Sequence, residues 1–137
     1  MKTLNKKQLL DIALGATFLG CGGGFSRKSA LSVLKRFPSD GIVNVASVEE
    51  AVKDKDKLTI MIAYIGAPTA ITNIKYPTGA LNAFDQAAAY AKRVYNKEIG
   101  YIIPVEIGAL NTIAPCLEAS ERNVKVVEGD GAGRAVP

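Results

Sequence analysis

Histidine is absent from the 137-residue sequence, which excludes a Ser-His-Asp triad, a Cys-His pair and every zinc motif that requires imidazole. Any chemistry must therefore use carboxylates, lysine, cysteine, hydroxyl groups, backbone amides or a bound cofactor. Cysteine is scarce too: Cys21 and Cys116 cannot build a disulfide framework, and a reducing cytoplasm is the expected compartment. Cys116 is expected in the first turn of a helix, where the dipole would lower the pKa of its thiol. A small, buried, apolar role is nevertheless favoured for both cysteines.

Long apolar runs and an excess of one charge are also missing. No apolar stretch approaches the roughly 20 residues that span a bilayer. The net charge is only +4, and the lysines of residues 53–57 alternate with aspartates, whereas a nucleic-acid footprint would be a basic stripe with interleaved aromatics. We therefore expect neither a membrane nor a nucleic acid as a partner. Lysines near the start precede an apolar stretch, as in a signal peptide, but Asp11 interrupts it and its periodicity favours an amphipathic helix.

The composition, with 48% apolar and 22% charged residues, is that of one soluble globular domain spanning residues 1–137. Strands are predicted at 42–45, 58–65, 101–105 and 124–127, the second as a continuous buried run. Helices are predicted at 5–19, 26–36, 80–96 and 111–122, with a brief helix after Ser47, and Asn5, Ser26 and Ser47 are the predicted N-caps. This alternation predicts an α/β fold with a mostly parallel sheet of about four strands and helices packed on it. No helix follows Val127 to cover the far edge of that sheet, so we expect an incomplete domain, truncated at its C-terminus.

A glycine cluster occupies positions 20 and 22–24, around Cys21. It is not a dinucleotide fingerprint, because no strand precedes it and Phe25 stands where the third glycine is needed. One interpretation is a helix end and a turn that lets two helices pack closely. The other is a nest of backbone amides at Gly22, Gly23 and Gly24, aimed at an anionic or carbonyl oxygen. The sequence favours neither over the other.

Polar residues follow the predicted strands at their carboxyl ends, where ligands bind in open parallel sheets. Gly66 and Thr69 lie in the turn after the second strand and offer a close backbone approach and a hydroxyl group, although a plain strand exit is an equal alternative. Glu106 directly follows the third strand and is the best single candidate. A carboxylate in a partly desolvated cleft suits general acid–base chemistry, and the alternative is a structural ion pair with Arg134.

Two further segments could complete such a site. Asn111 is either the N-cap of the next helix, with Pro115 in its first turn, or a group that binds the amide edge of a ligand. Asp130 and Arg134 lie among three glycines after the fourth strand, in a loop suited to wrapping a polar ligand.

Four motifs stand in a fixed order: LGCGGG at 19–24, GAPT at 66–69, PVEIG at 104–108 with Asn111 and Pro115, and GDGAGRAVP at 129–137. In this order they resemble the N-terminal domain of the S-methyl thiohydantoin desulfurase-like proteins over nearly the whole chain. The family was long catalogued as a domain of unknown function, with genes near those of hydantoinases and oxoprolinases. The resemblance also matches Lys75 to a family lysine, and family members continue beyond the position of Pro137 into a second domain.

What the resemblance implies is a hydrolase that removes methanethiol from an S-methyl thiohydantoin and leaves a hydantoin. On this hypothesis Glu106 activates water, and the amides of 22–24 stabilise the developing negative charge. Asn111 and Asp130 bind the ring edge, Arg134 orients Asp130 or the substrate, and Gly66, Thr69 and Lys75 complete the binding site. No cofactor is certain, and a divalent metal held by Glu106, Asp130 and water stays open.

Other classes of function stay open as well. A non-catalytic small-molecule-sensing or interaction domain is the main alternative, and an inactive fragment is the weaker one. The expected partners are a small-molecule substrate and either a second copy of the chain, in a homo-oligomer, or a second chain that supplies the C-terminal part.

Overall fold

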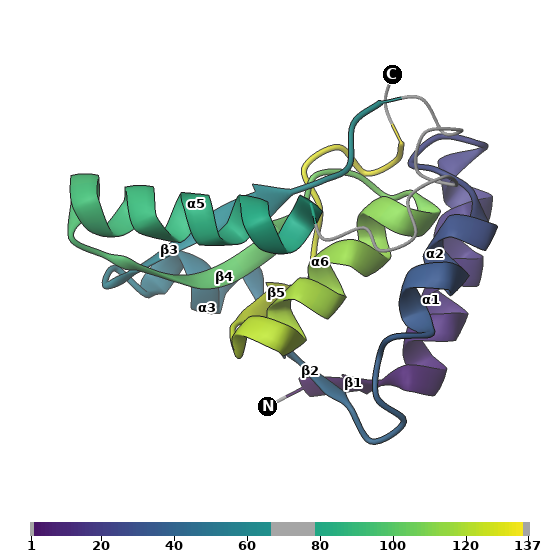
Figure 1. Cartoon of the computed structure of the whole chain (residues 1–137), viewed down its shortest axis with the longest axis horizontal. Helices are drawn as coiled ribbons and strands as arrows, with labels where there is room; N and C mark the ends of the chain where they lie inside the picture. The colour runs from purple at the N-terminus through teal and green to yellow at the C-terminus, as the bar shows by residue number, and fades with distance from the viewer. Residues whose placement is uncertain (1, 67–78, 136–137) are drawn as a thin grey trace.

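A five-stranded sheet organises the chain, whose computed structural model describes residues 2–66 and 79–135 (Figure 1). The strands are β1 (Lys2–Asn5), β2 (Ile42–Ala46), β3 (Lys57–Ile62), β4 (Glu98–Pro104) and β5 (Lys125–Val127). Their order across the sheet is β1-β2-β5-β4-β3. Only the β1–β2 pair is antiparallel, and the other three pairs are parallel. The predicted α/β class with a mostly parallel sheet is therefore confirmed.

Two details of the predicted sheet are wrong. The described chain has five strands rather than four, because β1 was missed: its residues KTLN carry almost no apolar signal, and three of the four are exposed. The last predicted strand, β5, is not a far edge in need of a covering helix. It lies between β2 and β4 and pairs with both, so its neighbours protect it on either side.

The third difference concerns β3, which was predicted as a continuously buried strand. It is an edge strand that pairs only with β4, and within it only Ile62 is buried while Met61 is exposed. One face of β3 is covered by a helix, and the apolar residues on its other face remain partly open to solvent.

Five helices are described, and local capping explains where three of them begin. They are α1 (Lys6–Gly20), α2 (Arg27–Leu34), α3 (Val48–Lys53), α5 (Gly79–Tyr95) and α6 (Ala109–Arg122). The side chain of Asn5 caps α1 in a reciprocal capping box with Gln8, and Ser26 and Ser47 cap α2 and α3. These three N-caps confirm the prediction. No helix in the two described ranges is both long and apolar enough to cross a membrane.

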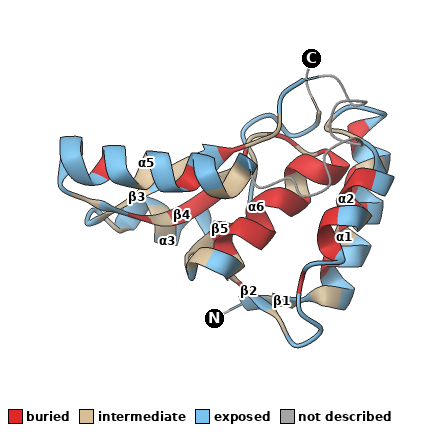
Figure 2. Ribbon diagram, viewed as in Figure 1, coloured by how far each residue is buried: buried red, intermediate tan, exposed pale blue. Residues whose placement is uncertain are grey.

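Helix α6 forms the centre of the core, and most of its residues are buried (Figure 2). It packs against the sheet on one side and against α1 and α2 on the other, while α5 covers β3 and β4 (Figure 1). The core includes Leu9 of α1, Leu34 of α2, Ile102 of β4 and Leu110 of α6. A smaller cluster, Ala46, Tyr101 and Val127, lies on a separate part of the sheet with Ala51 of α3.

The start of α6 differs from the prediction. The helix begins at Ala109 with Gly108 as its N-cap, so Asn111 is the third helical residue and not the cap. Pro115 therefore lies beyond the first turn, inside the helix. Because proline has no N–H group, it cannot donate the helical hydrogen bond to the carbonyl group of Asn111.

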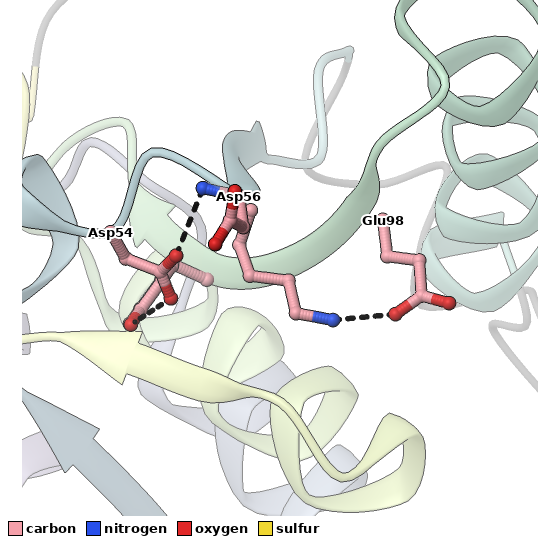
Figure 3. Close-up of polar contacts among 5 residues, drawn as sticks. Asp54, Asp56 and Glu98 are labelled. Atoms are coloured by element: carbon pink, nitrogen blue, oxygen red, sulfur yellow. Dashed lines mark hydrogen bonds and ion pairs between the residues drawn. The ribbon is translucent and has the colours of Figure 1, made fainter.

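Polar contacts join the amino-terminal parts of β3 and β4 and the turn before β3 (Figure 3). The Tyr101 hydroxyl donates to Asp54 at 2.9 Å and thereby lowers the pKa of that carboxyl group, and Lys57 pairs with Glu98. The backbone amide of Asp56 donates to the other oxygen of Asp54. These contacts hold the entry to β3 against β4, at the end of the strands opposite to the site described next.

Candidate functional site

A cavity of about 380 Å³ opens at the carboxyl ends of β3 and β4. Three segments line it: the glycine turn after α1, the exit of β3 and the exit of β4 with the first turn of α6. The lining residues are Gly22, Gly23, Gly24, Phe25, Ala63, Tyr64, Ile65, Gly66, Val105, Glu106 and Asn111. Its size lies within the usual range for small-molecule sites, and its position is the one that parallel sheets favour.

Glu106 and Asn111 form a buried, hydrogen-bonded pair in this cavity. Glu106 is 6% exposed and Asn111 is 3% exposed. The Asn111 amide nitrogen donates to Glu106 Oε1 at 2.7 Å, a short distance that is typical of a hydrogen bond to a carboxylate. The pair fixes the orientation of the Glu106 carboxylate.

The same Asn111 side chain holds the backbone of Tyr64 at the exit of β3. The Tyr64 amide donates to Asn111 Oδ1 at 2.9 Å, and Asn111 Nδ2 donates to the Tyr64 carbonyl at 3.1 Å. Both amide hydrogens of Asn111 are therefore used within the chain, one on Tyr64 and one on Glu106. This arrangement makes Asn111 a link between two strand exits and leaves it no hydrogen to donate to a ligand.

The glycine turn crosses the chain that follows Glu106 at close range. A Cβ atom placed on Gly108 would lie 2.4 Å from Gly24 Cα, and one placed on Gly24 would lie 2.4 Å from Gly108 Cα. Contacts under 3.0 Å essentially never occur for a Cβ atom, so both positions need glycine. The Leu110 amide donates to the Gly24 carbonyl at 3.0 Å and closes the crossing. Two of the four sequence motifs thus meet at a single backbone contact beside Glu106.

The glycine turn confirms the interpretation as a helix end and close-packing turn, and the nest of amides stays a prediction. The Gly23 amide donates to the Gly20 carbonyl at 2.8 Å, so it closes the end of α1 and does not point to a ligand. Left-handed φ angles of +95° at Gly22 and +65° at Gly24 turn the chain towards the cavity, and Phe25 follows with φ of +68°. The turn therefore serves close packing and also lines the cavity.

The loop after β5 lies beside the site, but its polar side chains do not enter the same cavity. Asp130 lines a neighbouring cavity of about 300 Å³, together with Thr112, and its carboxylate accepts hydrogen bonds from the amides of Ala132 and Gly133. Within the loop, Asp130 thus stabilises its own turn. The Gly131 amide donates to the Pro104 carbonyl at 3.1 Å and anchors the loop to the end of β4.

Arg134 is exposed, and the ion pairs found among residues 2–66 and 79–135 do not join it to Glu106. The alternative of a structural Glu106–Arg134 pair therefore has no support among the described ion pairs. Glu106 and Asp130 line different cavities, and the described part of the chain contains no cluster of three or more Asp, Glu, Cys or His side chains that could hold a metal.

The exit of β3 contributes the remaining described residues. Gly66 lines the cavity with φ of +136°, and Ile65 beside it is 98% exposed at the mouth. Thr69 and Lys75, both predicted for the site, lie outside the described residues.

Tyr64 and Phe25 are site residues that sequence reasoning missed. Their rings meet edge to face, with centroids 6.4 Å apart, and both line the cavity. A signal was available for Tyr64, since it is the single aromatic residue in the apolar run 58–65. Phe25 gave no such signal, because its place depends on the left-handed turn before α2.

The favoured prediction of a buried, apolar cysteine is confirmed for Cys116 and wrong for Cys21. Cys116 lies beyond the first turn of α6 and is buried, which raises the pKa of its thiol to about 12, opposite to the predicted dipole effect. Cys21 is exposed rather than buried and occupies the left-handed C-cap of α1.

These settings predict unequal thiol reactivity, since only the thiolate reacts. Treatment of the native chain with an aromatic disulfide reagent at about pH 8 should modify one thiol rapidly, and the second only after unfolding. The Cys21→Ser variant should lack the rapid phase. Rapid reaction of both thiols in the native chain would contradict the burial of Cys116.

Comparison with known proteins identifies the family and the fold of the chain. The family model described as "S-Me-THD-like, N-terminal domain" matches residues 7–137. The crystal structure of a protein from Chromobacterium violaceum, a structural genomics target, superposes with a TM-score of 0.89 at 32% sequence identity. The match covers 100% of this chain and 37% of that protein, so the chain spans little more than a third of its length. No curated protein matches the sequence.

Proposed function

The chain belongs to the S-Me-THD-like family as its N-terminal domain, and we propose that its cavity binds a small hydantoin-like ring and takes part in hydrolytic removal of methanethiol from an S-methyl thiohydantoin. The observation that carries this proposal is the Glu106–Asn111 pair. It presents a buried, oriented carboxylate in a cavity of about 380 Å³ at the carboxyl edge of the sheet. Because the solved relative is much longer, the activity of the whole protein is part of the proposal.

The proposed reaction adds water to the ring carbon that carries the methylthio group. Glu106 takes a proton from water while the oxygen attacks this carbon, and the C=N bond opens to give a tetrahedral intermediate. The hydroxyl proton of the intermediate passes to the ring nitrogen as the carbonyl forms and the C–S bond breaks, and the departing methanethiolate receives the proton held by Glu106. The products are a hydantoin and methanethiol, with one water consumed.

Backbone groups of the glycine turn supply the second element of the proposal. Negative charge develops on the ring nitrogen during attack, and N–H donors at fixed positions stabilise such charge without reorganisation. Since the Gly23 amide is already bonded to Gly20, this role falls to the amides of Gly22 and Gly24. Apolar groups, Phe25 and Tyr64 among them, form the walls that would hold the ring and limit its hydration.

Replacing Glu106 by glutamine tests the proposal directly. The side chain keeps its shape but can no longer accept the proton of water, so methanethiol release should fall by about 10²-fold or more. Headspace gas chromatography of methanethiol, with S-methyl thiohydantoin as substrate, measures this without interference from the protein thiols. The control is Glu49→Gln at the exposed start of α3, which should leave the rate unchanged.

A binding measurement on the same proteins separates the catalytic proposal from the sensing alternative. Full thiol release by Glu106→Gln would contradict the assigned role of Glu106. Binding of hydantoin, measured by calorimetry, with no release even by a full-length member of the family would favour a small-molecule-sensing domain, in which the Glu106–Asn111 pair would serve recognition.

A further inference from the structure

A second carboxylate is buried in α6, away from the cavity of Glu106. Glu118 is only 3% exposed and lines a small separate cavity of about 30 Å³. The charged and polar residues that share this lining are Arg36, Tyr64 and Glu121, among apolar neighbours. The volume accommodates about one water molecule and no larger ligand.

Glu118 has incomplete pairing. Its Oε1 lies 3.5 Å from Arg122 Nε, within the range of an ion pair, but neither atom makes a hydrogen bond within the described part of the chain and both are buried. Arg122 is held instead by α5, because it donates to Asp85 at 2.9 Å and lies 5.8 Å from the centre of the Phe84 ring. Arg122 is therefore held in place by its contacts with α5. Its positive charge lies near Glu118, but no hydrogen bond joins Arg122 Nε to Glu118 Oε1.

Tyr64 connects the small cavity of Glu118 to the candidate site. The residue lines both the small cavity of Glu118 and the large cavity of Glu106. Both of its backbone groups are bonded to the Asn111 side chain, which in turn bonds Glu106. Asn111 and Glu118 stand seven residues apart on α6, which is about two helical turns, so they lie on the same face of the helix.

We infer that Glu118 is a positioning residue: in its neutral form it supports Tyr64, and through Tyr64 the Asn111–Glu106 pair. The inference rests on the proposed function only for the importance of that pair. It concerns the structure of the chain, so it can fail or succeed independently of turnover. An ionised Glu118 would place a poorly solvated charge at the small cavity that Tyr64 also lines. Relief would require water in the small cavity or transfer of Arg122 from Asp85, and either change disturbs the packing around Tyr64.

The groups around Glu118 determine when this change occurs. Burial raises the pKa of Glu118 from its ordinary value of 4.5 to about 7; Arg122 opposes this shift, whereas Glu121 and Asp85 add to it. Burial also raises the pKa of the Tyr64 phenol; a hydrogen bond with the backbone of Ala80 lowers this pKa, Glu118 raises it further and Arg36 lowers it. The neutral form of Glu118 should thus predominate below about pH 7 and give way to the carboxylate above it.

Nuclear magnetic resonance of the chain tests the inference. We expect the signals of the Tyr64 backbone amide and the Asn111 side-chain amide to shift with pH, with a midpoint at about pH 7. This midpoint should be lost in Glu118→Gln, whereas in Glu121→Gln, the control on the exposed neighbour in the same helix, it should persist at a somewhat lower pH, because the charge of Glu121 adds to the shift. Persistence of the midpoint in Glu118→Gln would assign the shifts to another group and overturn the inference.

A measurement on the unaltered chain keeps the test decisive if Glu118→Gln fails to fold. The Glu118 carboxyl carbon and the Tyr64 amide should titrate with one common midpoint. If the Glu118 carboxyl carbon titrates at about pH 7 while the Tyr64 and Asn111 signals stay constant, Glu118 does not support the site and the inference is wrong.

The melting temperature provides the matching stability readout. Because the folded-state pKa of Glu118 is raised, its contribution to stability relative to glutamine is fully present below about pH 4.5 and is lost as the pH rises through about 7. The unaltered chain should therefore lose several degrees of melting temperature relative to Glu118→Gln between about pH 5 and about pH 8. A constant difference across this range would contradict the role given to the neutral form.

Discussion

Gly108→Ala is expected to lower the free energy of unfolding by about 3 kcal/mol or more, or to prevent folding. The new Cβ would lie 2.4 Å from Gly24 Cα and 3.0 Å from the Gly23 carbonyl oxygen. Both are backbone atoms, so relief requires the glycine turn and the α6 start to move apart. Separation would break the Leu110–Gly24 hydrogen bond and displace Glu106. Urea unfolding followed by circular dichroism measures the loss.

Gly108 is a cleaner test than Gly24, because its φ of −152° is open to any residue, whereas Gly24 also has a left-handed φ. The matched control is Gly15→Ala inside α1, where a Cβ atom has no neighbour within 4 Å. That change should raise the free energy of unfolding by about 0.5–1 kcal/mol, since alanine favours the helix. Similar effects of the two substitutions would show that the crossing tolerates a methyl group and does not fix the site.

Local signals in the sequence were sufficient to predict most of the helices. The N-caps Asn5, Ser26 and Ser47 each bond a backbone amide three residues further on, so their geometry depends on neighbouring residues alone. The helix predicted at 80–96 is α5, which buries Phe84 and Ala91. Tyr95 in its last turn is exposed.

Strand order could not be predicted, because it depends on contacts between distant segments. The three residues of β5 lie between β2 and β4, and nothing in their own sequence distinguishes an edge from a centre. Strand β1 pairs with β2, which is distant in the sequence, through backbone groups that leave no trace in the side-chain pattern.

The candidate site could be predicted only in part, because it too depends on contacts between distant segments. The rule that ligands bind at the carboxyl ends of parallel strands brought Gly66 and Glu106 to one place, and both line the cavity. The rule could not distinguish which polar side chains reach the cavity. Asp130 follows its strand as Glu106 does, yet its carboxylate is bonded within its own turn and lines the neighbouring cavity. The role of Asn111 depends on Tyr64, 47 residues away, and became visible only in the structure.

Asn111→Asp is the second substitution with a large expected effect, because it changes one atom at the link between the two strand exits. An oxygen would replace the nitrogen that donates to Glu106 at 2.7 Å and to the Tyr64 carbonyl at 3.1 Å. Two hydrogen bonds would be lost, acceptors would face acceptors, and two carboxylates would lie within hydrogen-bond distance in a buried setting. We expect the free energy of unfolding at about pH 8 to fall by about 3–5 kcal/mol.

The pH dependence of this loss distinguishes the buried pair from a general defect. At low pH one carboxyl group of the variant can hold a proton and donate it to the other, which restores the bond between residues 106 and 111. The folded variant therefore binds that proton more tightly than the unfolded chain does, so its stability is greatest in acid and is lost as the pH rises. Measured against the unaltered chain, the loss should be clearly smaller at about pH 5 than at about pH 8.

The matched control for this test is Asn82→Asp, the same change at an exposed position of α5. It should alter the free energy of unfolding by less than about 0.5 kcal/mol at both pH values, because its side chain is open to solvent. An equal loss for Asn111→Asp at both pH values would mean that the two carboxylates do not share a proton. The Glu106–Asn111 contact would then not be the feature that orients Glu106.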